Sequence, residues 1–274
     1  MLKTFKARSS RMRPPLLSKL LILAMALSGL FFAIRFSFFV RHLPEPIGSR
    51  MELFLAGAQL TVVLSLLAGL VGLVIGFFAA LARFSSLASV RYFSGTYSLV
   101  FRGTPLITQI LFVYYAVPVL FPFFKLNDFM SALIALSLNV GAYHAESIRA
   151  GILAVPRGQI EAARSLGLSY WSTLRWIILP QSLKLIIPSL LNNFIALLKD
   201  SSIASAIGLL ELTLTGQRIS SETFLPVPVL GTVAIIYLVL TCIILLMIRM
   251  VRWSLSGKTR LLNNFRSEWE HLSL

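Results

Sequence analysis

The chain has 274 residues, of which 57% are hydrophobic and only 13% are charged. Soluble domains contain about a quarter charged residues, so this composition excludes most soluble enzymes, disordered tails and free-standing nucleic-acid binders. The single cysteine, Cys242, excludes an intrachain disulfide and any multi-cysteine metal site. The net charge of +15 fits a membrane protein whose basic residues gather on one side of the bilayer.

Six apolar segments have a length close to that of a membrane span, which needs roughly 20 apolar residues in a helix. They predict helices at about 16–40, 53–82, 97–124, 129–152, 183–198 and 229–248. A membrane barrel would instead show ten-residue strands of alternating polarity. The sequence therefore predicts an all-α integral membrane protein with about six transmembrane helices.

Three regions follow from the positions of these segments. Residues 1–52 form a basic tail with an additional transmembrane helix and an outer loop, and residues 53–252 form a transmembrane domain of five helices. Residues 253–274 form a basic, polar tail. The region 201–228 is interrupted by glycine and proline, and we expect a half-helix and loop at the outer face.

Orientation follows from the distribution of basic residues. With six spans, both termini lie on the same side, and that side holds nineteen lysines and arginines against five on the other. Because positive charge accumulates on the cytoplasmic side, we expect the protein in the cytoplasmic (inner) membrane with both termini in the cytoplasm. The largest cytoplasmic loop then covers residues 153–181.

The first apolar segment has a second interpretation. Its basic beginning and apolar run resemble a secretory signal, with Ala24-Met25-Ala26 as a cleavage pattern. The apolar run continues well past Ala26, which favours an uncleaved helix. Either interpretation leaves the other five spans unchanged.

The sequence contains no recognisable catalytic or cofactor site. The three histidines lie far apart, the ten acidic residues are scattered, and no His-Glu-x-x-His pattern occurs. The sequence predicts a protein that is not an enzyme, with no metal site and no ATP site of its own. Any energy for transport would come from a partner.

The loop 153–181 contains a short predicted helix. Pro156 is placed to start it, and Glu161 lies where a carboxylate favours the positive end of the helix dipole. Small and apolar residues (Ala162, Ala163, Leu166, Gly167) form a face that fits a partner's groove, and Pro180 ends the segment. The alternative is an amphipathic helix on the inner leaflet, anchored by Trp171 and Trp176.

The spacing in this loop resembles the signature of membrane subunits of binding-protein-dependent ABC importers. All of its fixed positions are present: Glu161, Ala162, Ala163, Gly167, Ile177, Leu179 and Pro180. The resemblance covers about 53–252, and within it the chain is similar to the polar amino-acid uptake family. The segments that indicate this family are Phe101-Arg102-Gly103-Thr104-Pro105, Ala145-Glu146-Ser147-Ile148-Arg149-Ala150-Gly151, Leu198-Lys199-Asp200-Ser201-Ser202, Ile207-Gly208 and Glu211-Leu212.

The resemblance implies the type I permease fold and a set of partners. A second permease subunit, identical or related, would enclose the path, and an extracytoplasmic amino-acid-binding protein would deliver the substrate. Cytoplasmic ABC ATPase subunits would bind ATP and hold the loop helix through Glu161, Ala162, Ala163, Gly167, Leu179 and Pro180. Family members typically use five spans, so the segment before Pro44 is an addition, and His144 stands where a small or hydroxyl residue is more usual.

Polar residues inside the predicted spans are candidates for the substrate path, because charges at membrane depth are costly. The candidates are Arg102, His144, Glu146, Arg149, Asn192, Lys199 and Asp200. Structural roles compete with this: Glu146 and Arg149 fit an ion pair, and Lys199 and Asp200 fit a helix end. The amides of Asn192 and Asn193 fit interhelical hydrogen bonds. We expect Arg102 at the inner mouth of the third span, followed by a helix start or bend at Gly103-Thr104-Pro105.

Two other classes of protein compete with the importer subunit. A self-contained secondary transporter or channel for a small polar solute needs no ATPase contact, so it does not explain the complete loop signature. An intramembrane enzyme needs clustered catalytic groups, which the sequence does not contain.

Overall fold

The computed structural model describes residues 45–123 and 125–247. The chain divides into two units, 1–52 and 53–274, and most of the described residues belong to the second unit. All regular elements among the described residues are helices, which confirms the predicted class. The additional span at 16–40 and the tail at 253–274 lie outside the described residues.

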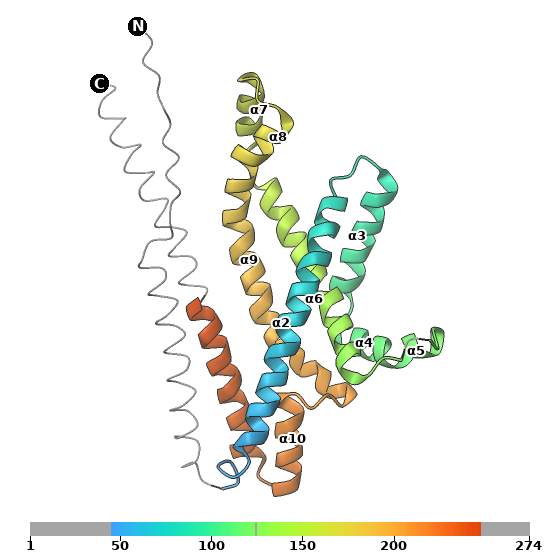
Figure 1. The fold of residues 1–274 in the computed structure, drawn as a ribbon, viewed down its shortest axis with the longest axis vertical. Helices are drawn as coiled ribbons and strands as arrows, with labels where there is room; N and C mark the ends of the chain where they lie inside the picture. The colour runs from blue at the N-terminus through green and yellow to red at the C-terminus, as the bar shows by residue number, and fades with distance from the viewer. Residues whose placement is uncertain (1–44, 124, 248–274) are drawn as a thin grey trace, which may run out of the picture. The chain divides into compact units, whose positions relative to one another are not determined.

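Long helices dominate this part of the chain (Figure 1). α2 covers Met51–Ala82, α6 covers Asp128–Leu153, and a final helix covers Pro226–Met247. A fourth helical run, Tyr170–Ile207, contains α8 (Tyr170–Thr173), the π-helical turn η2 (Leu174–Ile178), α9 (Leu179–Asp200) and the 3₁₀ turn η3 (Ser201–Ile207).

Within the described residues, α2, the run Tyr170–Ile207 and the helix Pro226–Met247 are long and apolar enough to cross a membrane. The spans predicted at 53–82 and 129–152 agree with α2 and α6 to within two residues, and the start of the last one to within three. α6 has the length of a span, at 26 residues, but contains ionisable residues in its second half.

The span predicted at 97–124 is not one continuous helix, and the helix start or bend expected at Gly103-Thr104-Pro105 is confirmed. The chain forms α3 (Ala88–Gly103) and then α4 (Leu106–Leu111), η1 (Phe112–Ala116) and α5 (Val117–Leu120), with a bend of 108° between the two parts. The residue before a proline is pushed out of the helical conformation, and Thr104 accordingly has φ −113° and ψ 149°. Pro105 is also extended, so the helix ends at Gly103 and restarts in a new direction.

Two buried side-chain amides donate hydrogen bonds to backbone carbonyl groups at this break. Gln109 Nε2 donates to the carbonyl oxygens of Phe101 (2.9 Å) and Thr104 (3.1 Å), and Asn139 Nδ2 donates to the same Phe101 oxygen (3.0 Å). Asn139 Nδ2 also donates to Gln109 Oε1 at 3.0 Å. Because an unpaired carbonyl costs several kcal/mol in hydrocarbon, these side chains are what permit a broken helix here.

Much of the segment 153–181, which was predicted as a cytoplasmic loop, is helical. α7 (Arg157–Ser165) begins directly after Pro156, as predicted, but the next helix already starts at Tyr170 and continues through Pro180. The helix that contains the fifth predicted span therefore begins before residue 183, and Pro180 does not end a helix as expected. Proline lacks a backbone N–H, and the π-helical turn η2 directly before it shifts the hydrogen-bonding pattern to i→i−5, so the helix is not interrupted.

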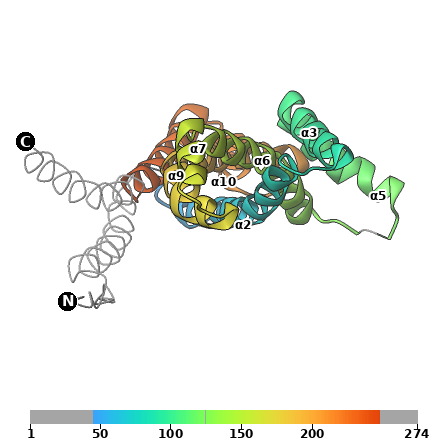
Figure 2. The same cartoon turned by 90° about the horizontal axis from the view of Figure 1, so that it is seen from above.

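α6 lies between α3 and α9, and α2 packs against it closely (Figures 1 and 2). An added Cβ at Gly76 of α2 would lie 2.5 Å from the Cβ of His144 and 2.8 Å from the carbonyl oxygen of Gly141. Only glycine permits this approach of two helix backbones, and Ala145 of α6 is buried at the contact.

The region 201–228 contains η3 and α10 (Leu212–Thr223). Glu211 is fully buried and caps α10 by accepting hydrogen bonds from the backbone N–H groups of Thr213 and Leu214, both at 2.9 Å. Tyr237 of the last helix donates to the same carboxylate at 2.9 Å. Burial raises the pKa of the Glu211 carboxyl above its ordinary value, and the hydrogen bonds only partly oppose this. Glu211 thus joins α10 to the last helix.

Candidate functional site

A cavity of about 430 Å³ lies where α3 breaks from α4, between α6 and α9. α6 contributes Asn139 and Tyr143 to its lining, and α9 contributes Asn193 and Asp200. The remaining lining residues come from the break and from the apolar faces of α4, α6 and α9: Thr104, Pro105, Leu106, Val140, Ala196 and Leu197. The cavity therefore presents two amides, a phenol and one carboxylate on an otherwise largely apolar wall, which is typical of a site for a small polar ligand.

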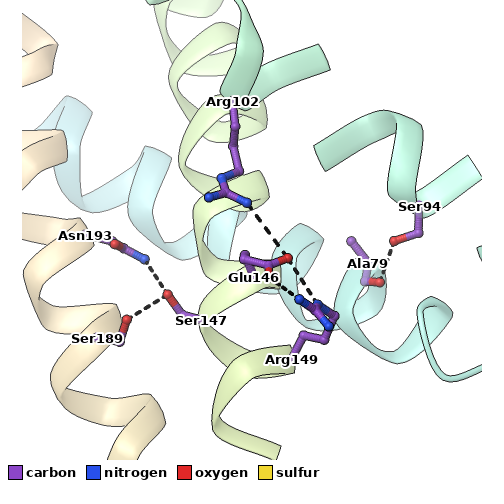
Figure 3. A network of polar contacts seen from close by, with 8 residues as sticks. All are labelled: Ala79, Ser94, Arg102, Glu146, Ser147, Arg149, Ser189 and Asn193. Atoms are coloured by element: carbon purple, nitrogen blue, oxygen red, sulfur yellow. Dashed lines mark hydrogen bonds and ion pairs between the residues drawn. The ribbon is translucent and has the colours of Figure 1, made fainter. Parts of the chain in front are cut away.

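A hydroxyl group joins α6 to α9 beside this cavity (Figure 3). Ser147 Oγ of α6 accepts hydrogen bonds from Ser189 Oγ at 2.8 Å and from Asn193 Nδ2 at 3.1 Å. Asn193 also lines the cavity. The position of this amide is thus fixed by a contact between the two helices.

An ionic cluster lies on the other side of α6 (Figure 3). Glu146 accepts two hydrogen bonds from Arg149, one of them from Nε at 3.2 Å, while Arg102 Nη1 lies 3.8 Å from Glu146 Oε2. The Arg102 guanidinium also lies over the Tyr143 ring, with its central carbon 5.5 Å from the ring centre. Arg102 thus contacts a residue that lines the cavity, Tyr143, and lies two residues before another, Thr104.

The structure brings together some of the predicted substrate-path residues. Asp200 lines the cavity, and Arg102, Glu146 and Arg149 form the adjacent cluster. Arg102 was expected near the start of its span, but it lies in the last turn of the 16-residue helix α3, about 21 Å along the helix axis from Ala88 at 1.5 Å per residue.

Other predicted residues lie elsewhere. Asn192 is exposed and does not line the cavity, whereas its neighbour Asn193 does. Lys199 lines a separate surface hollow of about 350 Å³, next to Tyr237. His144 is 3% exposed and packs against α2 at Gly76, and its two ring nitrogens have no hydrogen-bond partner among the residues that the structure describes.

The sequence prediction missed Asn139, Tyr143 and Gln109. Asn139 and Gln109 are amides within apolar helical segments, and a hydrogen-bonding side chain at membrane depth is a usable signal. Their relation was not visible in the sequence, because Gln109 contacts α6 only after the chain turns at Pro105.

α7 forms a second candidate site, at the opposite end of α9 from α10 (Figure 1). Glu161, Ala162 and Leu166 are exposed, with Leu166 at 82%, whereas Ala163 is buried against the neighbouring helix. A hydrogen bond between Gln159 of α7 and Gln181 of α9 joins the two helices. α7 is thus held against the run that begins at Tyr170 while its other face is free within the described structure.

Contrary to the prediction from the sequence, Gly167 does not form part of the apolar face of the loop helix. α7 ends at Ser165, and Gly167 follows it with φ +75°. The Gly167 N–H donates to the carbonyl of Arg164 (2.9 Å) and the Leu168 N–H to that of Ala163 (3.1 Å), which is the Schellman arrangement. The glycine is needed for this left-handed conformation, with no atom within 4 Å of an added Cβ.

Comparisons with known proteins agree with this architecture. The model of the family described as "Binding-protein-dependent transport system inner membrane component" matches residues 72–255. The glutamine transport system permease protein GlnP of Escherichia coli is 36% identical over 73% of this chain and 91% of its own length. The L-cystine transport system permease protein TcyB of Bacillus subtilis is 43% identical over 61% of this chain and 70% of its own length.

Solved structures show the same fold. A crystal structure of an amino acid ABC transporter with histidines is 37% identical, with a TM-score of 0.71 over 75% of this chain and 95% of that chain. The MetNI methionine ABC transporter, 20% identical, has a TM-score of 0.64 over 78% of this chain and supports the fold alone. From the match at 72–255 and these relatives, the chain belongs to the family of inner membrane components of binding-protein-dependent transport systems.

Proposed function

We propose that this chain is the permease subunit of an ATP-driven importer that moves a polar amino acid across the cytoplasmic membrane. The single observation that supports it best is the cavity at the α3–α4 break, with Asp200, Asn139 and Asn193 on its wall. A zwitterionic amino acid needs hydrogen-bonding groups and at least one charge in such a low-dielectric site. The relatives named for glutamine and cystine transport support the same class of substrate.

The exposed face of α7 is the proposed contact with the ATPase subunits. Glu161, Ala162 and Leu166 are available to a partner, and the small Ala162 permits close approach of a groove. We place this end of the bundle in the cytoplasm, because the basic residues gather there and the ATPase acts there. A second permease subunit and an extracytoplasmic binding protein complete the proposed assembly.

The helical run Tyr170–Ile207 connects the two sites and can carry motion from one to the other. Its start lies beside α7, where Gln181 bonds to Gln159, and its later part contains Asn193 and Asp200 of the cavity. Motion of α7 with the ATPase would therefore displace one wall of the cavity. In this proposal the helical bundle has two conformations, and the partners at its two faces alternately shift the equilibrium between them.

A pull-down from the native membrane tests the proposal. The tagged full chain is isolated in a mild detergent, and bound proteins are identified by mass spectrometry, in parallel with uptake of radiolabelled polar amino acids by cells. We expect an ABC ATPase with the wild type and a loss of both the ATPase and the uptake with Ala162→Arg, because a bulky charge blocks the exposed face.

The matched control is Ser86→Arg, which adds the same side chain at an exposed position of the loop between α2 and α3. Ala162 is a better test than Gly167, since any substitution at φ +75° also strains the backbone. Isolation of the folded chain alone, with unchanged uptake in Ala162→Arg cells, would instead support a self-contained transporter.

A further inference from the structure

Arg102 is held at the edge of the cavity by the break between α3 and α4. It lies one residue before Gly103, where α3 ends, and Thr104 already lines the cavity. Its side chain is 41% exposed and stacks over Tyr143, a second lining residue. A guanidinium on a long flexible stem can therefore reach the cavity without any movement of the backbone.

Arg102 has no full counter-ion within the ionic cluster. Arg149 already neutralises Glu146 through two hydrogen bonds, whereas the 3.8 Å separation of Arg102 and Glu146 exceeds hydrogen-bond length. No other carboxylate among the described residues lies within ion-pair distance of Arg102. Two guanidinium groups thus share one carboxylate, and one positive charge remains uncompensated.

Carbonyl groups at the end of α3 are already occupied by other donors. Cations are stabilised by free carbonyl groups at a helix C-terminus. Here the carbonyl of Phe101 is occupied by Gln109 and Asn139, and that of Val100 by Thr104. An uncompensated charge at this depth of a membrane protein is costly, so an anion that enters the cavity would be attracted to Arg102.

We propose that Arg102 binds the carboxylate of the transported amino acid and exchanges its weak contact with Glu146 for that carboxylate. The inference rests on the proposed function and names the group that recognises the substrate. Guanidinium and carboxylate match as a planar, two-hydrogen-bond pair, which a 3.8 Å contact with Glu146 does not provide. Asp200 on α9 is the acidic lining residue suited to the ammonium group. Glu146, held by Arg149, remains as the partner of Arg102 in the empty state.

The role of Arg102 is tested by measuring amino-acid binding to the purified complex of the full chain with its ATPase. The binding protein is left out. The probes are radiolabelled glutamine, histidine and arginine, and the competitors are the same amino acids with the carboxylate converted to an amide. We expect the wild-type complex to prefer the carboxylate form by about tenfold or more, as for a hydrogen bond between charged groups. Arg102→Gln should abolish this preference.

Three further variants separate recognition from a structural role. Arg91→Gln removes the same charge from the other end of α3, where Arg91 bonds only to loop carbonyls, and should keep the preference. Arg102→Lys should keep a weakened preference. Glu146→Gln removes the resting partner and should leave the amino-acid affinity equal or higher, whereas a merely structural ion pair would make Glu146→Gln and Arg102→Gln equally damaging.

The outcomes distinguish this inference from the proposed function. A wild-type complex that contains the ATPase and binds an amino acid, but does so equally well as its amide, overturns the role of Arg102 alone. An unchanged preference in Arg102→Gln does the same. Assembly with the ATPase without binding of any amino acid overturns the cavity as the substrate site as well, and absence of the ATPase overturns the proposed function.

Discussion

Two amide side chains stabilise the break between α3 and α4, beside which the cavity lies. Asn139 and Gln109 are 8% and 9% exposed and together provide the donors to the Phe101 carbonyl at the end of α3. Neither residue is charged, so neither stands out in a search for ionisable groups. Their effect is geometric, because they compensate the hydrogen bonds that the chain loses at Thr104 and Pro105 and so stabilise a bend of 108°.

We expect Asn139→Leu to destabilise the protein, because leucine has a similar size but cannot donate to the Phe101 carbonyl or to Gln109. Loss of these partners should cost about 1–3 kcal/mol, since it leaves buried polar groups unsatisfied. The measurement is the midpoint of thermal unfolding of the purified full chain. Asn192→Leu removes an exposed amide from α9 and is the control; equal midpoints for the two variants would contradict this account.

Helix α2 shows how an apolar element is positioned by its glycines. Its apolar surface alone would permit many rotations about the helix axis. The close approach at Gly72 and Gly76 selects one of them, because an added Cβ would lie 2.4 Å from Val140 at the first position and 2.5 Å from His144 at the second. A similar element-level device ends α7, where Gly167 supplies the left-handed residue.

Gly76→Ala should destabilise the protein although alanine favours helices, because its methyl group would meet the backbone of α6 at Gly141 and Ala145. Gly231→Ala in the last helix is the matched control. No atom lies within 4 Å of its added Cβ, so it should stabilise by roughly 0.5–1 kcal/mol through helix propensity. The measurement is the midpoint of thermal unfolding of both variants. A Gly76→Ala variant as stable as Gly231→Ala would show that α2 and α6 are not in close contact.

The whole bundle links its two candidate sites through one helical run. The run Tyr170–Ile207 starts beside α7 and ends beside the cavity, and it contacts α6 through Ser189 and Ser147. The same run contains a π-helical turn at Leu174–Ile178, and such turns occur frequently at functional sites. We expect that movement of α7 with the ATPase separates α9 from α6 at the Ser147 contact.

A disulfide between α6 and α9 should therefore block transport. In a chain with Cys242 replaced by serine, Ser147→Cys and Ser189→Cys place two thiols where the hydroxyl oxygens are 2.8 Å apart. We expect an oxidant to cross-link them, to stop amino-acid uptake while the ATPase stays bound, and a reductant to restore uptake. Each single cysteine variant should be insensitive to the oxidant. Full uptake by the cross-linked protein would show that the two helices do not separate.

The sequence by itself determined the helical membrane class, the positions of α2 and α6, and the start of α7 at Pro156. Long apolar segments, a proline and a complete motif are local signals, and their physical causes act within a few helical turns. The final helix was predicted for the same reason, with its start within three residues.

Only the tertiary structure decided which polar residues lie together. The sequence predicted a bend at Gly103-Thr104-Pro105 but not its direction. The break turns α4 toward α6, so that Gln109 meets Asn139 and Arg102 lies beside Tyr143. The choice of Asn193 over Asn192 depends likewise on the rotation of α9, which its packing against α6 fixes. Such arrangements depend on contacts between helices distant in the chain, because the bilayer requires each helix to satisfy its backbone but leaves the rotation and partners of helices to side-chain packing.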